Sequence, residues 1–265
     1  MSLLKWKKEN KGEVALLIDG ARRIGKSYIV EQFAKENYKS YILIDFNKVG
    51  KDIKDLFENY LDKLDIEIRK RIGFEKNKGS FLRLKNRFIS ECNNAKGIFA
   101  IRKKYKDSLR YLKTIPINKP KDCLKVGIIG ELYTAMEPYS NYELEKTLAS
   151  YHIEIKRFTN ISYLLWQKKF LLPFMKFRIR KYCKYTLGAD GLDNVYRINY
   201  LKRHHFDGVI HTKPTGCTPE IGAIPIMIKE AKDLNIPITF FSFDEQSGLD
   251  GIKTRLEAFY DLLNF

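Results

Sequence analysis

Short apolar runs alternate with helix-like segments through the second half of the sequence. The strand-like runs are residues 124–130, 153–158, 207–211 and 237–243, and the helix-like segments are 140–150, 219–234 and 249–263. This alternation favours a parallel sheet with helices on both faces. We therefore predict that residues 121–265 form a doubly wound, Rossmann/flavodoxin-like α/β domain, in which ligands bind beyond the carboxyl ends of the strands.

Three loops, at residues 130–141, 211–220 and 244–251, are expected to share that edge of the sheet. They carry the carboxylates that we assign to acid–base chemistry or substrate contact, namely Glu131, Asp244 and Glu245. His211, Glu137 and Glu220 lie nearby, but spacing alone assigns them no role. His204 and His205 are expected at the surface, where a helix ends.

Cys217 follows Gly216 and precedes a predicted helix whose first turn begins at Pro219. The positive end of a helix dipole favours a thiolate, which suits metal ligation or nucleophilic attack. The structural alternative is a cysteine packed under a tight turn. The other cysteines, Cys92, Cys123 and Cys183, are widely spaced, so neither a disulfide framework nor a local zinc site is indicated.

A glycine-rich motif stands near the start of the chain, with the sequence Gly20-Ala-Arg-Arg-Ile-Gly-Lys-Ser27. It follows the strand-like run 14–19 and precedes a helix-like segment at 27–35, which is the setting of a phosphate-binding loop. Gly20 and Gly25 would let backbone N–H groups surround phosphate oxygens, while Lys26 would bind the β- and γ-phosphates and Ser27 would bind Mg²⁺. The motif therefore predicts ATP and Mg²⁺ binding.

We predict three segments along the chain. Residues 1–65 form a truncated P-loop β-α-β module, with a second strand at 41–46 and a helix at 52–64. Residues 66–120 are basic and helix-like and form a helical connector, and residues 121–265 form the α/β domain.

The sequence is strongly basic, with a formal net charge of +17 over 265 residues. This charge is compatible with nucleic acid, an anionic membrane surface or an anionic small ligand, and by itself chooses none of them. Residues 168–184 combine cations with aromatics and are expected to form a helix with a solvated face, although they could also lie on a membrane or along RNA. Because no RNA-binding signature is present, a nucleic-acid partner is not favoured. The sequence has no membrane-spanning run and no signal peptide, so we expect a cytoplasmic location.

Five motifs in the C-terminal part occur in a characteristic order. They are Val126-Gly-Ile-Ile-Gly-Glu-Leu-Tyr-Thr-Ala-Met-Glu-Pro-Tyr-Ser-Asn141, Gly188-Ala-Asp-Gly191, Phe206-Asp-Gly-Val-Ile-His211, Gly216-Cys-Thr-Pro-Glu220, and Phe243-Asp-Glu-Gln-Ser-Gly248 continued through Thr254-Arg-Leu-Glu-Ala-Phe259. Residues 92–265 thus resemble the C-terminal part of the 2-hydroxyacyl-CoA dehydratase family and its activase-related proteins. The resemblance implies lyase chemistry on an acyl-CoA.

In that family a [4Fe–4S] cluster is held by cysteines from two α/β domains and is reduced by an ATP-dependent activator. Cys217 matches the cluster cysteine of the second domain. We expect the domain that carries the other cluster cysteines to be missing, so that cluster binding depends on a cysteine-bearing dehydratase subunit or is lost.

The first 65 residues resemble the start of an AAA-like P-loop ATPase, in residues 17–30 and 40–46. The segment Ile238-Thr-Phe-Phe-Ser-Phe-Asp-Glu245 looks like a Walker B strand but belongs to the dehydratase-like motifs, so hydrolysis is not expected from it. Three hypotheses remain: an iron–sulfur dehydratase-related protein, an ATP-binding protein or ATPase, and a catalytically inactive fusion of two partial genes.

Overall fold

The computed structural model describes residues 3–10, 26–37, 51–93, 95, 97–160, 162–163, 167–185, 187–188 and 190–264. The chain divides into two compact units, Met1–Lys51 and Asp52–Phe265.

The first unit contains two described helices, α1 (Leu3–Asn10) and α2 (Lys26–Asn37). The side chain of Lys7 donates a hydrogen bond to the carbonyl of Asn37, which ties the end of α2 to α1. The helix predicted at 27–35 is confirmed by α2. The predicted strands at 14–19 and 41–46 and the glycines of the phosphate-binding motif lie outside the described residues.

The second unit is built on a four-stranded sheet in which every described neighbour pair is parallel, in the order β2-β1-β3-β4. The strands are β1 (Lys125–Gly130), β2 (Glu154–Arg157), β3 (Gly208–Pro214) and β4 (Ile238–Phe243). β1, β2 and β4 lie within the predicted strand-like runs, and β3 begins in its predicted run and continues three residues beyond His211. β1 and β3 are central and almost entirely buried. β1 is apolar after Lys125, as expected of a buried parallel strand, whereas β3 also buries the polar residues His211, Thr212 and Lys213.

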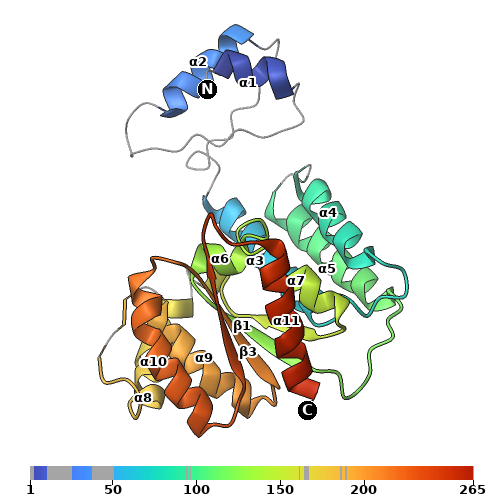
Figure 1. The fold of residues 1–265 in the computed structure, drawn as a ribbon. Helices are drawn as coiled ribbons and strands as arrows, with labels where there is room; N and C mark the ends of the chain where they lie inside the picture. The colour runs from blue at the N-terminus through green and yellow to red at the C-terminus, as the bar shows by residue number, and fades with distance from the viewer. Residues whose placement is uncertain are drawn as a thin grey trace. The chain divides into compact units, whose positions relative to one another are not determined.

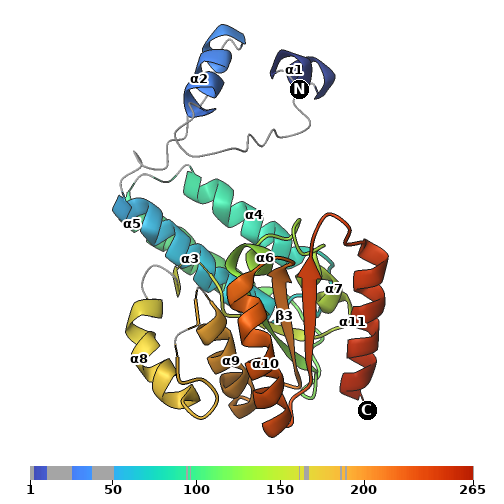
Figure 2. The same ribbon diagram turned by 60° about the vertical axis from the view of Figure 1, so that its left-hand side comes forward.

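Helices cover both faces of this sheet (Figures 1 and 2). One face carries α8 (Lys168–Ile179), α9 (Gly191–Arg203) and α10 (Thr218–Asp233), whose apolar side chains share a core with Ile129 and Val209. The other face carries α7 (Leu144–Ser150) and α11 (Leu249–Asn264), which pack against residues such as Ile128 and Ile210. The predicted doubly wound, parallel-sheet α/β fold is confirmed.

Three further helices form a separate apolar cluster beside the sheet: α3 (Lys51–Arg69), α4 (Ser80–Asn93) and α5 (Ile98–Thr114). Leu64, Phe81 and Phe88 lie at its centre and are fully buried. Ile72 contacts both this cluster and the core under α7 and α11, so the apolar core of these three helices is continuous with that of the sheet. Because α3 runs through residue 65, the predicted boundary between P-loop module and connector falls inside one helix.

Three of the described helices were not among the predicted elements: α1, the short α6 (Leu132–Met136) and α9. α9 does not show a clean apolar stripe, because its buried residues include Asp193, Asn194 and Arg197. Its end does agree with the prediction that His204 and His205 lie exposed where a helix stops.

α8 is the helix predicted within the basic segment 168–184. Its apolar residues divide between two environments: Met175 and Ile179 are buried, whereas Phe170 and Phe177 are exposed. In the described ranges, no helix combines the length and apolar character needed to cross a membrane.

Candidate functional site

The carboxyl ends of β1, β3 and β4 meet at one edge of the sheet, and hydrogen bonds join the loops that follow them. The N–H of Glu131 donates to the carbonyl of Thr212 (2.9 Å). The hydroxyl of Thr215 donates to Asp244 Oδ2 (2.9 Å), and the hydroxyl of Tyr142 donates to the carbonyl of Ser247. The three loops therefore form one continuous rim.

Glu131 is the N-cap of α6. Its carboxylate accepts hydrogen bonds from the backbone N–H groups of Tyr133 (3.0 Å) and Thr134 (2.9 Å) and from the Thr134 hydroxyl (2.6 Å). These bonds satisfy N–H groups that a helix N-terminus leaves without intrahelical partners. The structure therefore gives Glu131 a structural role at the rim.

Asp244 and Glu245 lie in the turn after β4. Asp244 accepts hydrogen bonds from Thr215, from the Gln246 N–H (3.0 Å) and from the Ser247 hydroxyl (3.0 Å). The Thr215 hydroxyl, followed by that of Ser247, holds the pKa of Asp244 below its ordinary value. Glu245 is exposed beside it. Asp244 thus organises the turn and presents Glu245 to solvent.

Cys217 is the N-cap residue of α10 and is partly buried. Its N–H donates to the carbonyl of Pro214 (3.2 Å), and its carbonyl accepts from the N–H of Ile221 (2.9 Å). Its side chain makes no capping hydrogen bond. Cys217 thus lies on the rim at the positive end of a helix, as predicted.

The segment containing Gly188 and Gly191 packs against the same turn. A Cβ atom added at Gly191 would lie 3.0 Å from the carbonyl oxygen of Pro219, and one at Gly188 would lie 3.5 Å from the Pro219 ring. Two motifs far apart in sequence, Gly188–Gly191 and Gly216–Glu220, are thus adjacent.

The other cysteines have separate surroundings. Cys92 belongs to the core of α3, α4 and α5, Cys123 precedes β1 at the opposite end of the sheet, and the Cys183 thiol donates to the carbonyl of Tyr185 (2.9 Å). Among the described residues, no group of three or more His, Cys, Asp or Glu side chains is placed to hold a metal ion.

A buried polar network lies directly beneath the rim. His211 Nε2 is 2.6 Å from Glu220 Oε2, and the Asn194 amide donates to both oxygens of Glu220 (3.0 and 2.9 Å). Asn194 Oδ1 in turn accepts from the N–H of Gly130 (3.0 Å) and from Arg197 (3.1 Å). The network joins β1, β3, α9 and the first turn of α10. Sequence reasoning singled out His211 and Glu220 without assigning a role, and it missed Asn194 and Arg197.

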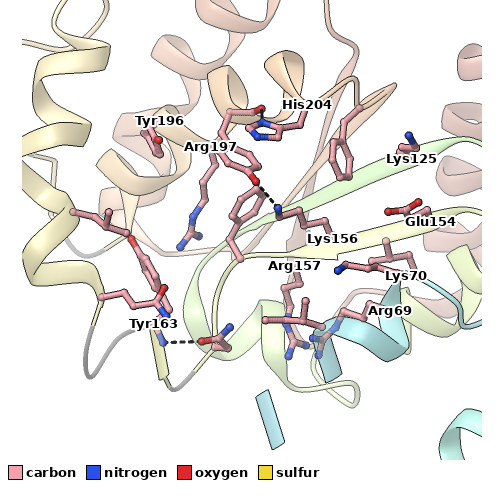
Figure 3. Close-up of a pocket in the computed structure, with 18 of the residues that line it drawn as sticks. Arg69, Lys70, Lys125, Glu154, Lys156, Arg157, Tyr163, Tyr196, Arg197 and His204 are labelled. Carbon is pink, nitrogen blue, oxygen red and sulfur yellow. Dashed lines mark hydrogen bonds between the residues drawn. The ribbon is translucent and has the colours of Figure 1, made fainter. Parts of the chain in front are cut away.

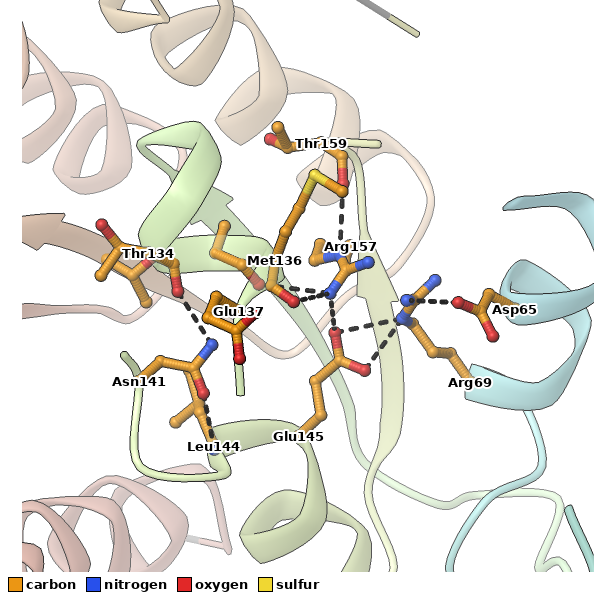
Figure 4. Close-up of polar contacts among 12 residues, drawn as sticks. Asp65, Arg69, Thr134, Met136, Glu137, Asn141, Leu144, Glu145, Arg157 and Thr159 are labelled. Atoms are coloured by element: carbon orange, nitrogen blue, oxygen red, sulfur yellow. Dashed lines mark hydrogen bonds and ion pairs between the residues drawn. The ribbon is translucent and has the colours of Figure 1, made fainter. Parts of the chain in front are cut away.

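An ion-pair cluster joins β2 to α3 and α7 (Figure 4). Glu145 contacts Arg157 (2.8 Å) and Arg69 (2.9 Å), and Arg69 also approaches Asp65 (3.5 Å). Burial acts to raise the pKa of Glu145, but Arg69 and Arg157 outweigh it and hold that pKa below its ordinary value. These residues fix α3 and α7 against the edge strand β2.

A cavity of about 610 Å³ opens along β2, between α3, α8 and α9 (Figure 3). Its wall carries cations, including Lys125, Lys156 and Arg197, together with tyrosines and aliphatic side chains. No sequence pattern predicts this cavity, because the residues that line it come from separate elements.

The phosphate-binding motif is described only in part. Gly20 and Gly25 lie outside the described residues, and Lys26 and Ser27 form the first turn of α2. A helix beginning at that lysine agrees with the expected strand–loop–helix arrangement.

The C-terminal unit is thus a parallel-sheet α/β domain with a cysteine at the rim, and family comparisons give its relationships. Residues 181–263 match the model of the 2-hydroxyglutaryl-CoA dehydratase D-component, and residues 13–115 match the model of an AAA domain. The first match includes Cys217, and the second includes the phosphate-binding motif and continues through α4 and α5. A search of curated proteins finds no match to the chain. Both resemblances identified in the sequence are confirmed.

Proposed function

We propose that this chain is a 2-hydroxyacyl-CoA dehydratase-related subunit that contributes Cys217 to a [4Fe–4S] cluster completed by a partner chain. The observation that supports this proposal is the position of Cys217, at the N-terminus of α10 on the ligand-binding edge of the sheet. It lies inside the segment that matches the dehydratase D-component.

The described residues do not make a complete cluster site by themselves. A [4Fe–4S] cluster requires four ligands, typically cysteine thiolates, whereas Cys217 is the one described cysteine at the rim. The remaining ligands would have to come from a cysteine-bearing dehydratase subunit. Such a cluster would supply one-electron transfer, and an ATP-dependent activator would be its reductant.

Within this proposal the rim carboxylates have different tasks. Glu131 and Asp244 are committed to hydrogen bonds that shape the loops, so they act as positioning residues. Glu245 is exposed on the turn that Asp244 organises, and we propose it as the carboxylate that contacts a polar substrate.

The test is anaerobic coexpression with cysteine-bearing dehydratase-like chains from the same organism, followed by iron and sulfide analysis. Iron uptake by the complex is expected, together with its loss in Cys217→Ala. Cys123→Ala is the matched control, because it removes a thiol at the opposite end of the sheet. Iron binding that persists in Cys217→Ala, or that is absent from the complex, would contradict the proposal.

The AAA-domain match supports a second candidate function, ATP binding through Gly20, Gly25, Lys26 and Ser27. We expect a fluorescent ATP analogue to bind in the presence of Mg²⁺ and Lys26→Ala to abolish binding, whereas Lys8→Ala on α1 leaves it intact. Equal binding by the Lys26 variant would exclude this site. If neither iron nor ATP binds, the remaining hypothesis is a catalytically inactive fusion of two partial genes.

A further inference from the structure

The cavity along β2 contains a buried cation without an ionic partner. Arg197 is 1% exposed, and its guanidinium forms no ion pair with the described residues. One of its terminal nitrogens donates to Thr159 Oγ1 (2.8 Å) and to Asn194 Oδ1 (3.1 Å), whereas the other has no hydrogen-bond partner among the described residues. An unpaired buried charge is unfavourable unless another group compensates it.

A second cation lies on the same aromatic ring. Arg197 is 5.4 Å from the centroid of the Phe158 ring, and Lys156 is 5.1 Å from it. Lys156 donates to the hydroxyl of Tyr200 (2.7 Å) and forms no ion pair in the described part of the chain. Two like charges therefore approach one ring, and Figure 3 shows Arg197 and Lys156 together on the wall of the cavity.

The nearby charges do not neutralise this pair. Glu154, a carboxylate in the cavity wall, is bound to Lys119 (2.6 Å). Arg69 and Arg157, which also line the cavity, are bound to Glu145. Asp193, one turn before Arg197 on α9, is bound to Lys168 (3.0 Å) and accepts from the Tyr163 hydroxyl (2.9 Å). Among the residues that line the cavity, cations therefore outnumber carboxylates.

The rest of the wall suits an apolar body. Leu171, Met175, Tyr196 and Phe206 line the cavity, and its volume of about 610 Å³ falls within the range of roughly 300–1,000 Å³ typical of small-molecule sites. We propose that this cavity binds an amphiphilic small anion, with its carboxylate or phosphate on Arg197 and Lys156 and its hydrocarbon part along these side chains. This site is separate from Cys217 and does not depend on the proposed cluster.

The test is calorimetric titration of the full chain with octanoate, octyl phosphate and octan-1-ol. At least one of the two anions is expected to bind, and octan-1-ol to bind at least about tenfold more weakly, because a charge-assisted hydrogen bond contributes about a factor of ten or more. The comparison between octanoate and octyl phosphate identifies the preferred head group. Equal affinity for octan-1-ol, or no binding of either anion at millimolar concentration, would overturn the proposal.

Two variants locate the site. Lys156→Met retains the aliphatic stem and is expected to weaken anion binding about tenfold, whereas Lys253→Met on α11 removes the same charge elsewhere and leaves binding unchanged. Leu171→Trp fills the cavity from its edge and is expected to weaken anion binding even if Lys156→Met does not fold. Unchanged affinity in Leu171→Trp would show that the anions bind elsewhere.

Discussion

His211 Nε2 lies 2.6 Å from Glu220 Oε2, and both side chains are completely buried. This contact joins the middle of β3 to the first turn of α10, three residues after Cys217. Because Asn194 links the same carboxylate to the N–H of Gly130, the position of the rim depends on polar groups that water cannot reach.

We expect Glu220→Ala to lower the free energy of unfolding by about 3 kcal/mol or more, since it leaves His211 and Asn194 buried without their partner. Glu220→Gln keeps the shape and is expected to have a smaller effect. Urea denaturation measures both, with Glu257→Gln on the exposed side of α11 as control. Equal midpoints for Glu220→Ala and the control would contradict this role for the buried pair.

Glu230 predicts a pH dependence of stability. Its carboxylate is fully buried, with no hydrogen-bond partner among the described residues. Burial, followed by the charge of Asp233, raises its pKa from 4.5 to about 8. The unfolded chain therefore ionises first, and stability falls by about 1.4 kcal/mol per pH unit as the pH rises between these two values.

Glu230→Gln removes this titration, so the variant is expected to exceed the wild type in stability at pH 8 and to match it near pH 4.5. Thermal unfolding across this range measures the difference. A constant difference at all pH values would mean that Glu230 does not titrate in this interval.

For Glu145 we expect the opposite change of stability with pH. Arg69 and Arg157 lower its pKa in the folded protein, so its stabilising contribution is present above the ordinary value of 4.5 and is lost as the pH falls through the lowered folded-state value. Glu145→Gln is expected to cost about 3 kcal/mol at pH 7, because it leaves two buried arginines without a shared partner. The difference in unfolding free energy between Glu145→Gln and the wild type should become smaller in acid.

The matched control is Asp107→Asn, which breaks the exposed pair of Asp107 with Arg110 and is expected to cost less than about 1 kcal/mol. Denaturant titrations at pH 7 and in acid compare the two variants. Similar losses of unfolding free energy in the two variants at pH 7 would contradict a stabilising role for the ion-pair cluster.

Gly130 and Gly222 form a contrasting pair. A Cβ atom at Gly130 would lie 1.9 Å from the carbonyl oxygen of Thr212, and its φ is +137°, so Gly130→Ala is expected to destabilise the fold by more than about 3 kcal/mol. Gly222 lies in α10 with nothing within 4 Å of its added Cβ. Gly222→Ala is expected to stabilise by up to about 1 kcal/mol. Unfolding midpoints test both, and a tolerated Gly130→Ala would contradict the close approach.

The cysteines are expected to differ in alkylation rate. Cys92 is buried, and burial raises the pKa of its thiol to about 11, so little thiolate is present near neutral pH. Cys217 is partly exposed at a helix N-terminus. Iodoacetamide should therefore modify Cys217 well before Cys92, as followed by peptide mass spectrometry, with denatured protein as the reference. Equal native rates would contradict this order.

The central strand β1 could be predicted from the sequence because it is buried and apolar from Val126 to Gly130, as a parallel strand covered on both faces is expected to be. α9 could not be predicted in the same way. Its inner face carries Asp193, Asn194 and Arg197, whose burial depends on partners elsewhere in the chain. Asn194, for example, accepts a hydrogen bond from the N–H of Gly130, which lies 64 residues earlier in the sequence.

The candidate site was predictable to a similar, limited extent. The rim loops and the place of Cys217 at a helix start follow from strand–loop–helix order. The capping role of Glu131 and the cavity along β2 do not, because each depends on side-chain directions that only the packed fold defines. The functional roles of Glu245 and Cys217, and nucleotide binding at Lys26, remain predictions.

The hydrogen bond from Glu131 to Thr212 has a consequence for how the rim can respond to a bound molecule. With Gly130 pressed against the backbone of Thr212, the loops after β1 and β3 have little freedom to separate. A molecule that displaces one loop must therefore displace the other, so an environment-sensitive fluorophore attached to Cys217 should sense an occupant bound several residues away beside α6.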